Sequence, residues 1–268
     1  MLAAFHIFYG EIQGGSSAHE KHKFISSEPT EFVIKKCDII DKLKRVSEES
    51  GYLRDPEVVR IIFDRGHIKL IDIIGDIEPP RKEQQPPKTI LNYGSSITHG
   101  MNSIDMSHSW TYLTAHNLNC DCRNLGMAGS CAMEPAVIDY IAEEGEKGNW
   151  DIATLEVGIN VLAWEEDKIY ERAVYAIEQV ALRNPDKPVI VISPFYWMGD
   201  FENETEADRW RRILEEVVDK LNLKNVYYKS GLDFIDKMAY ISADMVHPNI
   251  YGVQRIANVL TEFLQSIL

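Results

Sequence analysis

The sequence predicts an α/β protein in which a three-layer domain with a parallel β-sheet follows a small β-rich module. Two features predict this arrangement. Short apolar segments alternate with helical patterns after residue 88, whereas β-branched runs separated by polar turns occur before it. Between them, residues 78–88 hold paired prolines around charged and amide side chains, which is typical of a semi-rigid linker. We therefore expect the module to span residues 1–84 and the α/β domain to span residues 85–268.

The N-terminal module contains three β-branched runs that predict strands, at residues 31–37, 58–64 and 68–75. Helical periodicity occurs in this part only around residues 41–49. The strands are expected to pair mostly in the antiparallel sense. Because the module is short for an independent sandwich, we expect it to depend on the second domain or on another subunit.

Five short apolar segments in the second domain predict the strands of a central sheet that is covered on both faces. They lie at residues 89–93, 119–124, 152–157, 189–193 and 226–229. Strands that alternate with helices in this way imply a parallel sheet with right-handed crossovers.

Three amphipathic segments of the same domain predict helices, at residues 167–183, 205–221 and 249–268. The first and the last carry an apolar stripe at helical spacing. The middle one opens with Thr205 and Asp208, a pattern typical of a capped helix N-terminus. These helices supply the outer layers of the predicted fold.

Composition limits the function classes. The formal net charge of -14 argues against a nucleic-acid partner, since such binding depends on Lys and Arg neutralising phosphates. No run approaches the roughly 20 apolar residues that a membrane helix needs. Residues 1–15 include an apolar run without a preceding basic residue or a convincing cleavage site, so we expect a cytoplasmic protein. A neutral or cationic small substrate fits this composition better.

The four cysteines predict reduced thiols rather than disulfides. Cys120 and Cys122 are two residues apart in an expected strand, so their side chains point to the same face and cannot bond each other.

Ser96 is the candidate nucleophile. It follows the first strand of the α/β domain in the glycine-bounded turn Gly94-Ser95-Ser96-Ile97-Thr98-His99-Gly100, a strand-turn-helix setting that exposes a hydroxyl. The turn lacks the Gly-x-Ser-x-Gly elbow. The alternative interpretation is a serine that caps a helix.

His247 is the candidate base, and Asp244 is the candidate for orienting it. At a spacing of three residues both side chains can lie on one side of a turn, with Asp244 accepting from Nδ1 while Nε2 faces the serine hydroxyl. The alternative is a histidine that caps the last helix, because Pro248 and Asn249 are typical of a helix start. The joint occurrence with the serine motif favours the catalytic interpretation.

Gly129 and Asn160 are candidates for binding an oxyanion. Gly129 follows the second strand and lets its amide approach a ligand, while Asn160 follows the third strand and offers an uncharged donor. Each could instead serve a tight turn. Ser96, Gly129, Asn160 and His247 all follow strand ends, where open α/β sheets bind ligands.

These motifs, in this order and spacing, resemble the four sequence blocks of the GDSL, or SGNH, hydrolase superfamily. The resemblance covers most of residues 89–268 and implies a flavodoxin-like three-layer fold. It implies a nucleophile at Ser96, with Asp244 and His247 completing a triad. It also implies an oxyanion hole formed by the amides of Ser96 and Gly129 and by the side chain of Asn160.

The longer sequence segments around two of these motifs, residues 93–98 and 155–161, resemble those of one branch of the superfamily. In that branch a β-sandwich-type module precedes the hydrolase domain. Two departures are visible. Ser95 replaces the aspartate of the usual Gly-Asp-Ser, which could alter how the nucleophile loop is held, and Val161 replaces the aspartate that commonly follows the oxyanion asparagine. The module here is also shorter than that sandwich.

Other residues offer weaker alternatives. His99 and Trp197 are candidates for lining a substrate pocket, and Trp164 and Trp210 could stack on sugars, although tryptophans are more often core residues. Cys131 paired with His247 is an alternative nucleophile. No zinc-type spacing joins the remaining histidines that we considered as ligands, and these are His19, His22, His108 and His116.

We therefore expect a serine esterase that cleaves short-chain acyl esters, acetyl esters of carbohydrates among them, without a metal or organic cofactor. An acyltransferase that uses the same acyl-enzyme is the nearest alternative, and a non-catalytic carbohydrate-binding protein on this fold is another. The expected partner is a small-molecule ester, with no nucleic acid and no membrane, and a homo-oligomer is compatible with the sequence.

Overall fold

The computed structural model describes residues 4–15, 23–24, 27–64, 66–203 and 205–268. The chain divides into two compact units, of which the first comprises Met1–Pro87 with Asp105–Ser107. The second comprises Lys88–Ile104 with His108–Leu268. Each unit is considered by itself below.

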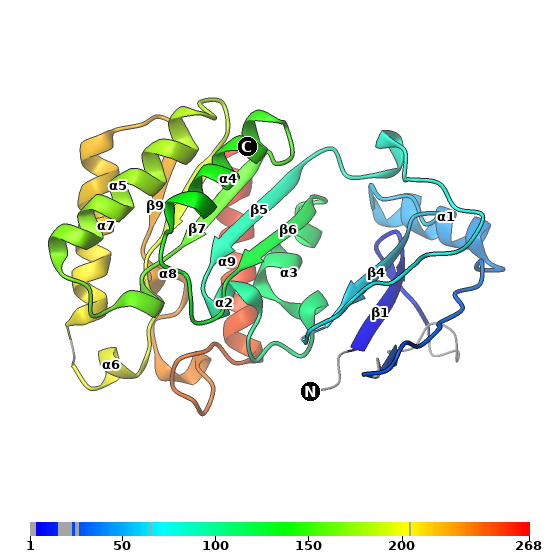
Figure 1. Cartoon of the computed structure of the whole chain (residues 1–268), viewed down its shortest axis with the longest axis horizontal. Helices are drawn as coiled ribbons and strands as arrows, with labels where there is room; N and C mark the ends of the chain where they lie inside the picture. Colours follow the sequence, from blue (N-terminus) through cyan, green and yellow to red (C-terminus); the bar gives the residue numbers. More distant parts are fainter. Residues whose placement is uncertain (1–3, 16–22, 25–26, 65, 204) are drawn as a thin grey trace. The chain divides into compact units, whose positions relative to one another are not determined.

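The second unit contains a five-stranded parallel sheet in the order β6-β5-β7-β8-β9 (Figure 1). Its strands are β5 (Thr89–Gly94), β6 (Asp121–Gly126), β7 (Ile152–Glu156), β8 (Val189–Ile192) and β9 (Val226–Lys229). The predicted α/β class is confirmed. All five predicted strands are present, and β6 begins two residues later than expected because Asn119 adopts a left-handed conformation (φ 51°) that ends the preceding turn.

Helices cover both faces of this sheet, as Figure 1 shows with α5 and α7 on one side and α9 on the other. Successive strand residues point to opposite faces, so Leu91 packs in the core under α4, α5 and α7, whereas Ile90 packs in the core under α3 and α9. The helices are α3 (Trp110–Asn117), α4 (Pro135–Glu146), α5 (Glu166–Leu182), α7 (Glu206–Leu221) and α9 (Ile250–Ile267). This is the predicted three-layer arrangement.

The capping prediction for α7 is wrong. The helix begins after Thr205 as expected, but no side-chain hydrogen bond caps it. Asp208 instead accepts a hydrogen bond from Arg211 Nη1 at 2.7 Å, and this ion pair takes the carboxylate away from the helix terminus.

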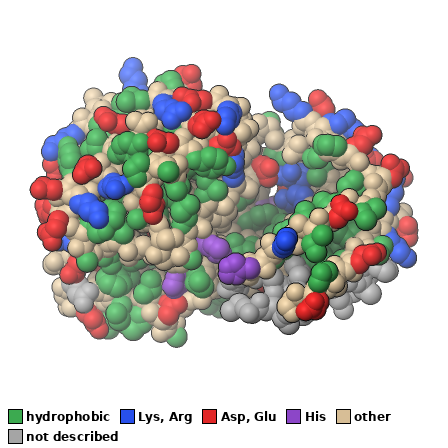
Figure 2. Space-filling model, in the orientation of Figure 1, with side chains coloured by type: hydrophobic (Ala, Val, Ile, Leu, Met, Phe, Trp, Pro, Cys, Tyr) green, Lys and Arg blue, Asp and Glu red, His purple; other side chains and the backbone are tan. Residues whose placement is uncertain are grey.

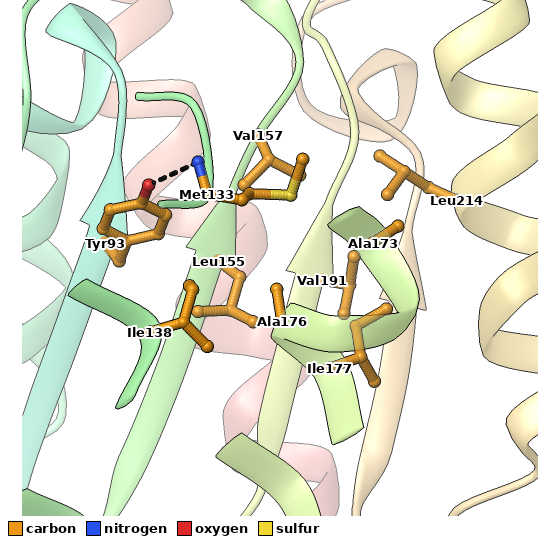
Figure 3. Close-up of a pocket in the computed structure, with 10 residues that line it drawn as sticks. All are labelled: Tyr93, Met133, Ile138, Leu155, Val157, Ala173, Ala176, Ile177, Val191 and Leu214. Atoms are coloured by element: carbon orange, nitrogen blue, oxygen red, sulfur yellow. Dashed lines mark hydrogen bonds between the residues drawn. The ribbon is translucent and has the colours of Figure 1, made fainter. Parts of the chain in front are cut away.

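The core between the sheet and helices α4, α5 and α7 encloses a small apolar cavity of about 10 Å³ (Figure 3). Its one polar contact in the figure is the hydroxyl of Tyr93, which accepts a hydrogen bond from the Met133 amide at 2.9 Å. A volume close to that of one water probe, lined by aliphatic side chains, is a packing defect. No ligand site is therefore expected there.

The first unit is built around β1 (Ala4–Tyr9), which pairs antiparallel with β2 (Ile12–Gln13), β3 (Lys23–Phe24) and β4 (Val59–Phe63). A helix, α1 (Ile40–Ser50), follows β3. The small antiparallel sheet and the helix agree with the sequence prediction. The strand β1 was not predicted, because its continuous apolar run lacks the alternation of a half-buried strand.

Two predicted strands of this unit are wrong. Residues 31–37 and 68–75 form no strand, although both are rich in β-branched side chains. β-branched composition favours an extended backbone, but a strand also needs a neighbouring chain to receive its hydrogen bonds. The side chains of Ile71 and Ile74 are 68% and 91% exposed and pack on no sheet.

None of the helices in the described part of the chain combines the length and hydrophobicity that crossing a bilayer requires. On the face shown in Figure 2, acidic and basic side chains are intermingled over the helices of the second unit. That distribution gives a polyanion no continuous basic surface on this face.

Candidate active site

The nucleophile candidate lies where β5 ends and a short helix, α2 (Ser96–His99), begins. Ser95 caps this helix, because its Oγ accepts a hydrogen bond from the Ile97 amide at 3.1 Å. In the alternative interpretation Ser96 would cap this helix, but the cap is its neighbour, Ser95. The hydroxyl of Ser96 is left for another partner, on a residue that is 8% exposed.

That partner is the histidine predicted as a base. Ser96 Oγ lies 2.8 Å from Nε2 of His247, which is 151 residues further along the chain. Nδ1 of the same ring lies 2.9 Å from Oδ2 of Asp244. A carboxylate at Nδ1 fixes the proton there, so Nε2 presents its lone pair to the serine hydroxyl.

Asp244 is held by four hydrogen-bond donors. Its Oδ1 accepts from the amides of Val246 (3.0 Å) and His247 (2.9 Å), and its Oδ2 accepts from His247 Nδ1 and from Asn102 Nδ2 (2.7 Å). Burial raises the pKa of this carboxyl, but the two amides, the imidazole and Asn102 outweigh it and lower the pKa to about 2. Asp244 is therefore ionised throughout the neutral range.

Asn102 was missed by sequence reasoning. It lies in the turn after α2 with a left-handed backbone (φ 63°), and an asparagine in such a turn is ordinarily explained by its conformation alone. Only the folded chain shows that its amide reaches a carboxylate 142 residues away.

The loop that carries the histidine is anchored at the start of α9. Asn249 caps this helix by accepting from the amides of Tyr251 and Gly252, both at 3.0 Å. Its Nδ2 donates to the carbonyls of Ala239 and Ile241. The cap is thus Asn249 and not His247, which contradicts the capping interpretation of the histidine and leaves its imidazole to Ser96 and Asp244.

The two oxyanion candidates lie beside the serine. Asn160 is in a short 3-10 turn after β7, and its Oδ1 accepts from the Cys131 amide at 3.1 Å. Because that bond fixes the amide oxygen, the Nδ2 group is the end available to a ligand. Gly129 has a left-handed backbone (φ 73°), and a Cβ built there would meet no atom within 4 Å, so conformation rather than space selects glycine.

These groups open into one pocket of about 360 Å³, a size within the ordinary range for small-molecule sites. Apolar side chains form most of its wall. Its lining residues are Ser96, Met101, Ala128, Gly129, Ile159, Asn160, Trp197, Val246 and His247. Nucleophile, base and oxyanion candidates therefore face the same small volume.

The two residues expected to line the pocket differ in their placement. Trp197 lies in its wall. His99 does not, since its ring turns toward β6 and its Nδ1 lies 3.2 Å from the Gly126 carbonyl oxygen. Trp164 and Trp210 pack against each other, with ring centroids 6.2 Å apart and Trp210 fully buried, so Trp210 offers no face to a sugar.

The segment after Trp197 contains the short helix α6 (Met198–Phe201). Arg211, which is 6% exposed, forms a two-pronged ion pair with Asp200, and Asp200 in turn accepts from the Trp197 amide at 3.0 Å. The Met198 amide donates to the carbonyl of Met245, in the loop between Asp244 and His247. The pocket wall and the histidine loop are thus bonded to each other.

Cys131 is a poor nucleophile. It is 1% exposed, its Sγ donates to the Glu156 carbonyl at 3.6 Å, and burial together with the charge of Glu156 raises the pKa of its thiol well above the usual range. Among the described residues no group of three His, Cys, Asp or Glu side chains could hold a metal ion. His19 and His22 lie outside the described residues.

Comparisons with known proteins agree with this architecture. A putative GDSL-like lipase from Bacteroides ovatus is 24% identical with a TM-score of 0.59, over 67% of this chain and 53% of that one. A salicylyl-acyltransferase from a tetracycline biosynthetic pathway is 20% identical with a TM-score of 0.57, over 67% and 55%. The Clostridium thermocellum family 3 carbohydrate esterase is 19% identical with a TM-score of 0.54, over 67% and 96%.

At these identities the likeness concerns the fold, and this chain spans about half the length of the first two structures. No curated protein matches the sequence. A family model does match, described as the GDSL-like lipase/acylhydrolase family, over residues 87–265. Because these residues make up most of the chain, the protein belongs to the GDSL-like lipase/acylhydrolase family.

Proposed function

We propose that the protein is a serine esterase that hydrolyses short-chain acyl esters through an acyl-enzyme on Ser96. The observation that carries this proposal is the relay Ser96–His247–Asp244, in which the two side-chain contacts are 2.8 and 2.9 Å. A hydroxyl bonded to an imidazole that is itself oriented by an ionised carboxylate is the arrangement that makes serine nucleophilic.

In the first half of the reaction, Nε2 of His247 takes the proton of Ser96 as Oγ attacks the ester carbonyl carbon. The tetrahedral intermediate collapses when His247 returns this proton to the alkoxide oxygen, so the alcohol leaves and an acyl-serine remains. Water then attacks the acyl-serine with the same imidazole as base. The acid is released and the serine hydroxyl is restored. Asp244 stabilises the imidazolium in both halves without taking its proton.

The negative oxygen of each intermediate is expected to bind the amides of Ser96 and Gly129 and the Nδ2 group of Asn160. Such donors act where charge develops, so they stabilise the transition state more than the substrate. Because these donors carry no charge, they bind the neutral carbonyl oxygen of the ester only weakly.

Asn160→Ala is expected to lower kcat by about a hundred- to a thousand-fold with little change in KM, because it removes one oxyanion donor. The alanine also removes the acceptor of the Cys131 amide. Asn160→Asp is the matched variant, since it keeps that acceptor but loses the donor. Steady-state hydrolysis of a nitrophenyl acetate should show a large loss for both. A near-normal Asn160→Asp enzyme would contradict the assigned role.

The pocket supports a small, uncharged acyl group. Its volume is modest and its wall is mostly apolar, with Trp197 as the one large aromatic side chain. The net charge of -14 favours neutral or cationic substrates over anionic ones. The likeness to a carbohydrate esterase makes acetyl esters of sugars the first natural substrates to test.

Asp244→Asn is expected to lower kcat by about ten-thousand-fold, because the amide can donate to Nδ1 and so leave Nε2 carrying the proton. In the unchanged enzyme, activity should rise with pH, because only a neutral imidazole can act as the base. Asp244 should not contribute to this rise, since its pKa of about 2 leaves it ionised well below the working range. Initial rates measured from pH 4 to pH 9 would test both statements.

The lowered pKa of Asp244 also determines how the stability of the folded protein depends on pH. Its favourable contribution is complete above the ordinary value of 3.8 and is lost as pH falls toward about 2. Denaturation midpoints of the unchanged protein and of Asp244→Asn should therefore converge in that acid window and not near neutrality.

An acyltransferase is the second candidate, favoured by the likeness to a salicylyl-acyltransferase. The same acyl-serine would pass to an alcohol if the site excludes water. A panel of nitrophenyl esters and acetylated sugars, tested on the unchanged protein and on Ser96→Ala with and without an acceptor alcohol, separates the candidates. Free acid alone supports the esterase, and acylated acceptor at low alcohol concentration supports the transferase.

A non-catalytic carbohydrate-binding protein predicts neither product. It also predicts no labelling of Ser96 by a fluorophosphonate, whereas both enzymes predict labelling that Ser96→Ala abolishes.

A further inference from the structure

A fully buried carboxyl group lies beneath the nucleophile turn and has no part in the triad. Glu156 is the last residue of β7 and is 0% exposed. Its Oε2 accepts three hydrogen bonds, from the amide of Ser95 (2.7 Å), the hydroxyl of Ser95 (2.7 Å) and the hydroxyl of Thr98 (3.0 Å). Ser95 and Thr98 flank Ser96 on its two sides, so one oxygen holds both ends of the turn.

The contact extends into the helix that carries the nucleophile. The same Ser95 hydroxyl that donates to Glu156 accepts from the Ile97 amide, and this joins the carboxyl group to the first turn of α2. A Cβ built on Gly94 would lie 2.6 Å from Glu156 Oε2 and 2.1 Å from Thr98 Oγ1. Only a glycine lets the backbone at residue 94 lie this close to Glu156 and Thr98. The contact with the carboxyl group therefore determines how deeply the turn is buried.

The arrangement suits a carboxylate better than an uncharged group. Three donors converge on Oε2, and hydrogen bonds to an ionised acceptor are stronger than those to a neutral one. The second oxygen, Oε1, has no partner among the described residues, so a proton placed there would find no acceptor. Burial raises the pKa of Glu156 to about 7, against the lowering effect of the Ser95 and Thr98 donors. The group therefore changes charge close to neutral pH.

The titratable side chains on the surrounding elements are Tyr93 on β5, His99 on α2, and Cys131 and Glu134 in the loop before α4. The charge of Glu134 acts on Tyr93 and Cys131. Burial raises the pKa of both Tyr93 and Cys131, so each is neutral near pH 7. His99 turns to the Gly126 carbonyl. Strand β8 contributes only Val and Ile side chains beside β7. No cation in these neighbours offsets the charge of Glu156, and the donors of the nucleophile turn are left to stabilise it.

We propose that Glu156 is a positioning residue for the nucleophile: its carboxylate fixes the turn of residues 94–98, and its protonation misplaces the Ser96 hydroxyl relative to His247. The inference rests on the proposed function. It also gives a reason for Ser95, where the usual motif has an aspartate. An aspartate there would put a second carboxylate against Glu156, whereas the serine hydroxyl adds a second donor to that of the backbone amide.

Glu156→Gln tests the role, because the amide keeps the volume and one acceptor but removes the charge. We expect kcat to fall by roughly ten- to a hundred-fold, the cost of a misplacement of about 1 Å, with KM within about twofold of the unchanged enzyme. The acid limb of the pH profile should also change. The loss of activity that follows protonation of Glu156 in the unchanged enzyme should be absent from Glu156→Gln.

Thr98→Val is the milder variant, since it removes one of the three donors and keeps the shape of a buried side chain. A loss of about three- to tenfold in kcat is expected, with the pH profile displaced to higher pH because the carboxylate is less stabilised. If Glu156→Gln fails to fold, as judged by its thermal transition, this variant carries the test. A folded Glu156→Gln with the kcat and the pH profile of the unchanged enzyme would overturn the proposal. A Thr98→Val pH profile that does not move would also overturn it.

Failure of the positioning role is distinguishable from failure of the esterase assignment. If Ser96→Ala keeps its activity, the esterase mechanism is wrong whatever Glu156 does. If Ser96→Ala is inactive while Glu156→Gln is normal, the mechanism stands and only the role of Glu156 is wrong. The coupled pair Ser95→Asp and Ser95→Asp/Glu156→Gln adds a check, because removing the Glu156 charge should recover part of the activity that the aspartate destroys.

Discussion

Ser96→Ala is expected to lower kcat for nitrophenyl acetate hydrolysis by about a million-fold, to the residual rate that the oxyanion donors alone support. The reason is that the acyl-enzyme cannot form without Oγ, while the pocket around it is unchanged. KM should stay close to that of the unchanged enzyme, because one small oxygen contributes little to binding the ester. Single-turnover mass spectrometry should detect the acyl adduct in the unchanged protein and none in the variant.

Ser266→Ala is the matched control, since this serine is exposed near the end of α9 and its hydroxyl donates to the Phe263 carbonyl of its own helix. It should keep full activity. Retention of most activity by Ser96→Ala, with its thermal transition unchanged, would remove the serine mechanism and with it every role assigned to the surrounding residues.

His247→Ala should cost about as much as the loss of the serine, again about a million-fold in kcat, because nucleophile and base act as one unit. The truncation leaves a space bounded by Ser96, Asp244 and Val246, next to the open pocket. Added imidazole should therefore restore part of the rate. The rescue should grow with the concentration of the neutral form, since only the neutral ring accepts the serine proton.

His67→Ala serves as the control for loss of a histidine, because His67 is exposed and belongs to the other compact unit. It should behave as the unchanged enzyme. Equal activity of His247→Ala and His67→Ala would show that the 2.8 Å contact between the imidazole and Ser96 has no catalytic role.

Much of the α/β unit could be predicted from sequence because its signals are local and repeated. A strand buried on both faces, such as Val189–Ile192, reads as an unbroken apolar run, and a helix such as Glu166–Leu182 shows its stripe over several turns. The first unit lacks such local and repeated sequence signals. Its segments at residues 31–37 and 68–75 have strand composition without a strand partner, and partners are not a local property.

The residues of the site also fall into those that local sequence could predict and those that it could not. Ser96, Asp244 and His247 could be chosen because each stands in a motif, and the structure brings them within hydrogen-bonding distance. Their catalytic roles stay predictions. Asn102 and Glu156 could not be chosen, since their importance lies in contacts with residues far along the chain. The one available signal was Glu156 itself, an acid at the end of a fully buried strand.

The distance along the chain between Ser96 and His247 has a consequence for biosynthesis. A ribosome makes the serine, its turn and the five strands of the sheet before it makes the imidazole, which lies 151 residues after the serine. An emerging polypeptide therefore carries a serine without its base until the histidine loop has been made. The activity should arise only when Ile250–Ile267 docks onto the sheet and carries its capping loop into place.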